Sequence, residues 1–101
     1  MDPATAELHR RARAFVALER YAEILAHVAF FGRDRASELV PRFGLSMEQW
    51  TVIDAAWTHE LAEGKRRQQY EQAERFNMTF AKTRGWLVST QPAMNAIQGY
   101  P

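Results

Sequence analysis

The sequence predicts an all-α protein, a small, mostly antiparallel four-helix bundle with an extended C-terminal tail. Apolar residues recur three, four and seven positions apart, which is the period of an amphipathic helix. Residues that begin helices stand before these segments, and glycines stand after them. The 101 residues are 47% hydrophobic and 25% charged, the balance of one globular domain. We expect a helical domain over residues 1–85 and the tail over residues 86–101.

The first helix is predicted from Asp2 to Phe31 without interruption. Asp2 offers a side-chain oxygen to the first turn, and Pro3 has the backbone angle that a first helical residue needs. Gly32 is expected to end the helix. One apolar stripe runs along this segment through Leu8, Phe15, Leu18, Ala22, Leu25 and Ala29.

A short second helix is predicted from Asp34 to Phe43, with Asp34 as its cap. Pro41 lacks the amide hydrogen of a helical residue, so we expect this helix to be short or distorted. Gly44 then has the position of a C-terminal cap, and Leu45 follows as an apolar residue that packs back on the helix. The inward residues of this segment are Leu39, Val40 and Phe43.

A capping box begins the third helix, which is predicted from Met47 to Ala62. In this motif the Ser46 hydroxyl accepts a hydrogen bond from the amide three residues on, and the Gln49 side chain returns to the Ser46 amide. Gly64 is expected to end the helix. Its inward face comprises Trp50, Ile53, Trp57 and Leu61.

The fourth helix is predicted from Lys65 to Arg84, and Gly85 is expected to stop it. A short turn would make it antiparallel to the third helix. The charges agree with this pairing, because residues 47–64 carry four acidic and no basic side chains, whereas residues 65–101 carry six basic and two acidic ones, a net of +4. The inward face comprises Tyr70, Ala73, Phe76 or Asn77, and Phe80.

Composition excludes several classes of protein. A net charge of +1 is too balanced to require a nucleic acid or an anionic membrane as partner. The chain has no cysteine, which excludes disulfides and thiolate metal sites. No apolar run approaches the roughly 18 residues of a membrane span, and the N-terminus lacks the basic and apolar stretches of a secretory signal. We therefore expect a cytoplasmic protein with no membrane span.

Residues 36–46 look like the first helix and turn of a helix-turn-helix motif, which makes a nucleic-acid-associated regulator an alternative function. The following helix would enter the major groove and contact phosphates. That helix carries four acidic residues and no Lys or Arg between Met47 and Gly64. DNA would repel it, so the sequence argues against nucleic acid as the partner.

No pattern of polar residues indicates a catalytic, cofactor or metal site. Two Glu–His pairs stand four residues apart, whereas di-metal helical bundles use a spacing of three together with further inward glutamates. The two pairs are Glu23 with His27 and His59 with Glu63. No nucleophile stands beside a base and an orienting group in the pattern, so we expect no enzyme activity, no cofactor and no metal. Asp54 falls on the inward half of the third helix, where we expect it to hydrogen-bond an indole or Asn77.

The uncharged tail is one candidate surface for contact with another protein. It holds the apolar residues Trp86, Leu87, Val88, Met94, Ile97 and Tyr100. Aromatic and Met side chains are common anchors of interfaces. We expect the tail to dock in a groove, either on its own bundle or on another subunit, with one helical turn near residues 93–98.

The basic turn formed by Lys65, Arg66 and Arg67 is the other candidate. Cations at a helix N-terminus oppose the helix dipole, so this placement is locally unfavourable. The turn either binds an acidic partner or pairs its positive charges with Glu60 and Glu63 across the two helices.

Several short motifs within residues 20–80 carry a resemblance to a family of helical proteins. They are Arg20-Tyr21-Ala22-Glu23, Arg33-Asp34-Arg35-Ala36-Ser37-Glu38, Phe43-Gly44-Leu45-Ser46, Trp50-x-x-Ile53-Asp54-x-x-Trp57 and Glu74-Arg75-Phe76. With these motifs the chain resembles short helical proteins encoded near bacterial type VI secretion clusters. The tail after Gly85 and the basic turn depart from that pattern. The resemblance implies no catalytic residues and an accessory or adaptor role in assembling or loading a secretion machine or its effectors.

The predicted function is a non-catalytic protein–protein interaction module, an adaptor or accessory subunit. The expected partner is another protein, a larger assembly or a second copy of the chain. A helix-turn-helix regulator and a small structural subunit of a larger assembly are the alternatives.

Overall fold

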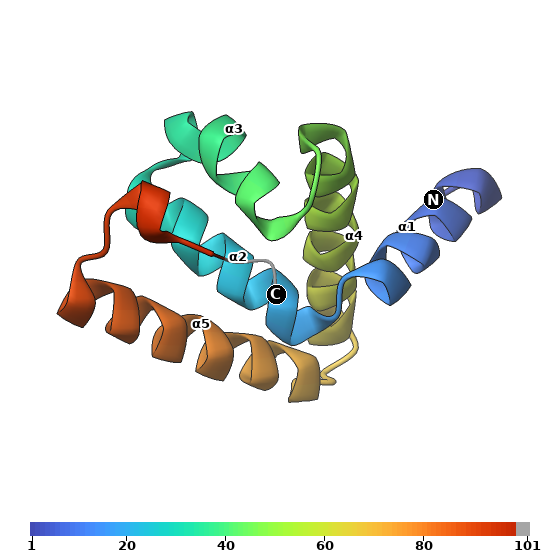
Figure 1. Cartoon of the computed structure of the whole chain (residues 1–101). Helices are drawn as coiled ribbons and strands as arrows, with labels where there is room; N and C mark the ends of the chain where they lie inside the picture. Colours follow the sequence, from blue (N-terminus) through green and yellow to red (C-terminus); the bar gives the residue numbers. More distant parts are fainter. Residues whose placement is uncertain (99–101) are drawn as a thin grey trace.

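The computed structural model describes residues 1–98, and the regular structure within them is entirely helical (Figure 1). The α-helices are α1 (Pro3–Phe15), α2 (Leu18–Phe31), α3 (Ala36–Leu39), α4 (Met47–Arg66) and α5 (Glu71–Thr90). Three 3₁₀ turns are η1 (Arg33–Arg35), η2 (Val40–Phe43) and η3 (Met94–Ala96). The all-α prediction is confirmed, but residues 1–98 form five α-helices rather than four. None of the helices in this part of the chain has the length and hydropathy needed to cross a membrane.

The long first helix expected over residues 2–31 is wrong, because the chain leaves the helical conformation at Val16 and Ala17. Both residues have extended backbone angles. The Val16 carbonyl accepts a hydrogen bond from the Trp57 indole nitrogen at 2.8 Å instead of continuing the helix. A straight helix over residues 3–31 would measure about 44 Å, longer than the 40 Å long axis of the molecule. The break therefore lets α1 and α2 pack against different helices.

The helices are not arranged as the mostly antiparallel bundle that was expected. α2 and α5 lie side by side and run in the same direction (Figure 1). Arg75 near the start of α5 hydrogen-bonds Glu19 near the start of α2. His27 and Trp86, in the C-terminal halves of α2 and α5, line the same cleft. α4 stands across α5 instead of running antiparallel to it (Figure 1).

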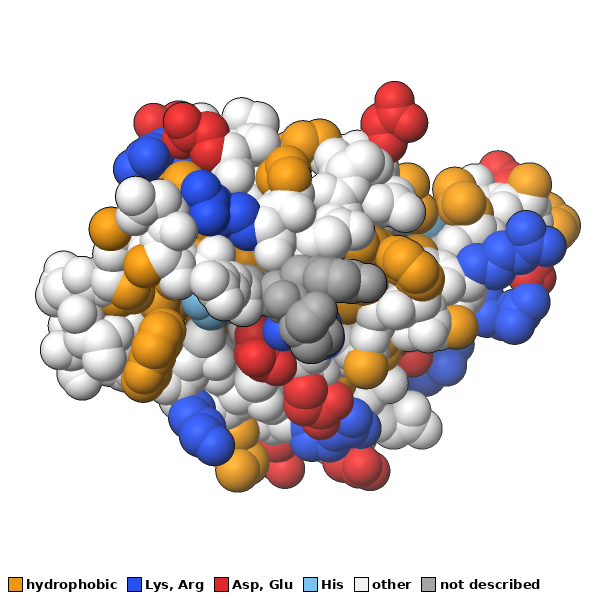
Figure 2. Space-filling view, in the orientation of Figure 1, with side chains coloured by type: hydrophobic (Ala, Val, Ile, Leu, Met, Phe, Trp, Pro, Cys, Tyr) orange, Lys and Arg blue, Asp and Glu red, His pale blue; other side chains and the backbone are white. Residues whose placement is uncertain are grey.

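α1 packs against α4 and projects from one side of the molecule (Figure 1). In the space-filling view, Lys and Arg side chains gather on this projecting part together with hydrophobic ones (Figure 2). Leu8 is 51% exposed and Phe15 is 64% exposed. The N-terminal part of the predicted apolar stripe is therefore only partly used in the core.

The predicted caps of α1 and α4 are confirmed. The Asp2 carboxylate accepts from the Thr5 amide at 2.7 Å. The Ser46 hydroxyl accepts from the Gln49 amide at 3.0 Å, and the Gln49 side chain accepts from the Ser46 amide at 2.8 Å. Local hydrogen bonds of this kind satisfy the free amides of a first turn, so they depend little on the rest of the fold.

The short second helix is present but distorted, as Pro41 predicts. The predicted segment is divided into η1, α3 and η2, and η2 contains Pro41. Asp34 lies within η1 and does not cap the segment. Gly44 ends it with a left-handed backbone at φ 78°, and Leu45 is buried beside it. The three inward residues, Leu39, Val40 and Phe43, are all buried.

Gly64 does not end α4, which continues to Arg66. The chain turns instead at Gln68, which has a φ of 60°. The turn then folds back on the helix, because the Gln69 amide donates to the Gly64 carbonyl at 2.8 Å. A Cβ on Gly64 would lie 3.1 Å from the Gln69 carbonyl oxygen. This glycine therefore permits a close approach of backbone rather than a helix end.

Gly85 does not end a helix either. α5 begins at Glu71 rather than Lys65 and continues through Gly85 to Thr90. A Cβ on Gly85 would meet no atom within 4 Å, so nothing in the fold requires a glycine here. Tyr70, expected to point inward, is half exposed just before α5. The first residues of the predicted extended tail are thus helical.

The segment after Gly85 docks on the chain's own core. Leu87 is 0% exposed, and Met94 and Ile97 are also buried in the main hydrophobic cluster. The predicted helical turn is confirmed as η3. Trp86 and Val88, which flank Leu87, are half exposed. Tyr100, named with these residues in the sequence, lies outside the described residues.

Candidate functional site

The basic turn lies at the C-terminal end of α4, not at the N-terminus of the next helix. Lys65 and Arg66 are in the last turn of α4, and Arg67 is its C-cap. Cations at this end are favoured by the helix dipole, so the expected local penalty is wrong. Arg66 hydrogen-bonds Glu63, and Arg67 lies 3.8 Å from the same carboxylate. The hydrogen bond from Arg66 lowers the pKa of Glu63, which identifies a surface ion pair within one helix end.

The predicted tail residues are divided between core and surface. Leu87, Met94 and Ile97 are buried in the chain's own core, so no partner can reach them without unfolding the C-terminal segment. Trp86 stays at the surface, where it lines a cleft between α2 and α5.

Asp54 has a different partner from the one expected. The Tyr21 hydroxyl donates to its carboxylate at 2.5 Å, and neither an indole nor Asn77 is its partner. Burial raises the pKa of Tyr21, and the bond to Asp54 raises it further. The Tyr21 ring also packs on Trp50 and Phe76, with ring centres 5.6 and 5.8 Å apart. The pair joins α2 to α4 and α5, so Asp54 has a structural role.

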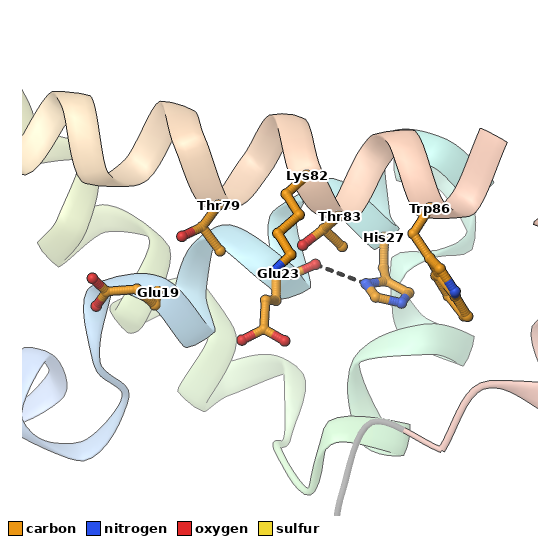
Figure 3. Close-up of a pocket in the computed structure, with 7 residues that line it drawn as sticks. All are labelled: Glu19, Glu23, His27, Thr79, Lys82, Thr83 and Trp86. Atoms are coloured by element: carbon orange, nitrogen blue, oxygen red, sulfur yellow. Dashed lines mark hydrogen bonds between the residues drawn. The ribbon is translucent and has the colours of Figure 1, made fainter. Parts of the chain in front are cut away.

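The α2–α5 cleft is a hollow of about 560 Å³ between the two parallel helices. Its lining residues are Glu19, Glu23 and His27 from α2 and Thr79, Lys82, Thr83 and Trp86 from α5 (Figure 3). Glu19 lies at one end, while His27 and Trp86 lie at the other (Figure 3). The volume is in the range of small-molecule sites.

His27 is the most buried polar group of the cleft, at 8% exposed. Its Nδ1 lies 2.7 Å from the Glu23 carbonyl oxygen (Figure 3). A carbonyl only accepts, so Nδ1 carries a hydrogen and donates it to this carbonyl. The ring packs edge-on against Phe43, with ring centres 5.1 Å apart. His27 is thus fixed by its own helix and by the core.

The charges of the cleft favour no single class of ligand. Glu19 is held by two hydrogen bonds from Arg75, at 2.8 and 2.9 Å. Glu23 and Lys82 leave one acid and one base on opposite walls. Among residues 1–98, no three His, Cys, Asp or Glu side chains gather as a metal site would require. The cleft offers hydrogen-bonding groups without a nucleophile paired to a base.

The α1–α4 groove is the second hollow and has a different character. It measures about 480 Å³ and lies open between α1 and the first turns of α4. Its lining residues are Leu8, Arg11, Ala12, Phe15, Glu48, Gln49 and Val52. Four of the seven are apolar, and the two largest, Leu8 and Phe15, are at least half exposed. Exposed apolar side chains that gather in a hollow are one feature of binding sites, so the groove is a candidate site.

Sequence reasoning missed this groove, although a signal was present. Leu8 and Phe15 stand seven apart and were assigned to the core stripe of one long helix. Around them, α1 carries the charged residues Glu7, Arg10, Arg11 and Arg13. A helix that is buried on most of its sides would not carry so many charges. An apolar pair within a charged helix is typical of an exposed contact face.

Comparison with known proteins found no family model, curated protein or solved structure that matches this chain. Its function must therefore be inferred from its own residues and geometry.

Proposed function

We propose that this protein is a non-catalytic protein–protein interaction module, an adaptor or accessory subunit, and that it binds its partner through the α1–α4 groove. The observation that carries the proposal is the exposure of Leu8 and Phe15 on an open apolar hollow. Burying such side chains against a partner removes apolar surface from water, at roughly 25 cal/mol per Å². Large apolar anchors with a charged rim are what protein interfaces use.

The shape of the groove favours a macromolecule over a small molecule. It is wide open, with one wall from α1 and the other from α4. Arg11 stands on the first wall and Glu48 on the second, so a partner with both apolar and charged side chains would fit. A small ligand would leave much of Phe15 in water.

The packing of α4 weighs against the alternative of a DNA-reading helix. Trp50, Ile53 and Trp57 of α4 are buried in the core, and another side of the helix packs on α1. Its remaining surface carries Glu48 but no Lys or Arg before Lys65. DNA binding would require contact with phosphates. The secretion-system role, the cytoplasmic location and the structural-subunit alternative stay predictions from the sequence.

The experiment replaces the groove anchors and compares the proteins retained from an extract of the source organism. Tagged full-length chains carry Leu8→Ser with Phe15→Ser, or Met78→Ser as the control. Met78 is an exposed apolar residue of α5 outside the groove, so the control removes similar surface elsewhere. We expect a partner that the wild type and the control retain and the groove variant loses, while circular dichroism shows all three chains folded. Equal retention by the folded groove variant would contradict the proposal.

A further inference from the structure

We propose that the occupant of the α1–α4 groove is a second copy of this chain, related to the first by a two-fold axis through the groove. This inference rests on the proposed function, since it names the partner of the same surface. It is carried by the opposite charge of the two groove walls and by the apolar residues between them.

The wall from α1 is basic. Arg11 is the charged residue of α1 that lines the groove, and α1 also carries Arg10, Arg13 and the acidic Glu7. Glu7 is already engaged, because Arg10 hydrogen-bonds it and Arg11 lies 3.6 Å from it. The Arg11 side chain is 76% exposed and lines the groove. Its contact with Glu7 is long and the guanidinium has five N–H donors, so Arg11 can still bind a carboxylate on another molecule.

The wall from α4 is acidic. Glu48 lies in the first turn of α4 and lines the groove opposite Arg11. No ion pair within residues 1–98 uses Glu48. Glu48 is the charged residue of α4 that lines the groove, and α4 has no Lys or Arg before Lys65. Glu48 is exposed, so its carboxylate can pair with a positive side chain supplied by another molecule.

A two-fold axis that runs along the groove, in the plane of the contact, exchanges the two walls. Rotation by half a turn places α1 of one copy over α4 of the other, and the reverse contact forms at the same time. Each dimer then contains two pairs of Arg11 with Glu48, one from each direction. A surface that meets itself in this way must be self-complementary, and a basic wall beside an acidic wall fulfils that condition.

The same rotation covers the exposed apolar residues. Leu8 and Phe15 stand seven residues apart on one face of α1, which is two helical turns. Val52 lies across the groove on α4. In the dimer the Leu8 and Phe15 side chains of one copy lie over Val52 and the apolar floor of the other. The groove is thereby closed on its open side.

The test uses charge reversal and mixing, with mass measured by sedimentation equilibrium over a range of protein concentrations. We expect the wild-type chain to dimerise. Arg11→Glu alone and Glu48→Arg alone each juxtapose like charges twice and should weaken dimerisation at least about tenfold. An equimolar mixture of the two variants should dimerise again. In the mixed pair, the two introduced charges meet each other, and native Arg11 meets native Glu48.

Lys82→Glu is the matched control, because it reverses a charge on the α2–α5 cleft and should leave dimerisation unchanged. A wild-type chain that is monomeric at every concentration would overturn the inference, as would a mixture that stays monomeric while the wild type dimerises. A dimer that resists both reversals and Phe15→Ser would also overturn it. If the monomeric chain still retains another protein through Leu8 and Phe15, the inference fails and the proposed function survives. If it dimerises as expected, the partner is identified.

Discussion

The α1–α4 groove and the α2–α5 cleft are hollows of similar size that differ in the side chains lining them. The groove measures about 480 Å³ and exposes Leu8 and Phe15 to water. The cleft measures about 560 Å³ and is lined mostly by polar side chains, several of which are bonded within the chain. Leu87, which follows the cleft residue Trp86 on α5, is completely buried. The difference teaches that polar side chains of the α2–α5 cleft are engaged within the fold, whereas the α1–α4 groove leaves its two largest apolar side chains in water.

The difference can be attributed to how each helix pair is joined to the rest of the molecule. α2 also packs on α3, and the segment after α5 docks on the same core, although Met78, Trp86 and Val88 of α5 stay exposed. Among the helices, only α4 makes extensive contacts with α1 within residues 1–98. A helix that packs on one neighbour leaves its other sides in water. Stability measurements should therefore separate the two regions.

The largest effect is expected for Leu87→Ala in the buried face of α5. Leu87 is fully buried, so its truncation should lower the free energy of unfolding by about 3 kcal/mol. Val88→Ala is the matched control, because the neighbouring side chain is half exposed and should change stability by less than about 0.5 kcal/mol. Urea denaturation measures both. If the two variants were equally stable, the end of α5 would not be part of the core, and the contrast between the regions would be lost.

A smaller loss is expected for Trp57→Phe at the junction of α1 and α2. The substitution removes the donor to the Val16 carbonyl and leaves a buried acceptor unsatisfied. We expect a loss of about 2 kcal/mol. Trp86→Phe is the control in the cleft wall, where the indole is half exposed and donates no hydrogen bond within residues 1–98. Thermal melting distinguishes them, and equal melting temperatures would show that the Trp57 bond does not fix the break between the helices.

The smallest effect at neutral pH is expected for Tyr21→Phe, which removes the contact that joins the two regions. Asp54 is half buried and can be hydrated once the hydroxyl is gone, so the loss should be about 1 kcal/mol. Tyr70→Phe removes a hydroxyl from an exposed side chain and should leave stability at neutral pH unchanged.

The same pair predicts a dependence on alkaline pH. Burial and the bond to Asp54 raise the pKa of Tyr21 above its value of about 10 in the unfolded chain. Above that pH the unfolded state loses the proton while the folded state keeps it, so this residue makes stability fall as pH rises. The slope should approach about 1.4 kcal/mol per pH unit. The advantage of the wild type over Tyr21→Phe should therefore shrink above pH 10. A constant difference in urea titrations across that range would contradict the assignment.

Features that depend on neighbouring residues could be predicted from the sequence. The capping box at Ser46, the cap at Asp2, the C-cap at Gly44 and the distortion at Pro41 are all present. The burial of Trp50, Ile53 and Trp57 also follows from their spacing. Each of these features is decided by hydrogen bonds or periodicity within a few residues, so it needs no knowledge of the rest of the fold.

The tertiary structure alone decided the features that depend on distant contacts. The break at Val16 is stabilised by Trp57, and Gly64 accommodates the returning turn. Gly85 stays helical because its helix is held by Leu87 in the core. The candidate groove belongs to the same class, because Leu8 and Phe15 have the spacing of core residues and are exposed only because α1 turns away from α2. Local sequence determined where helices can begin and which faces are apolar, whereas long-range packing determined which of those faces is covered.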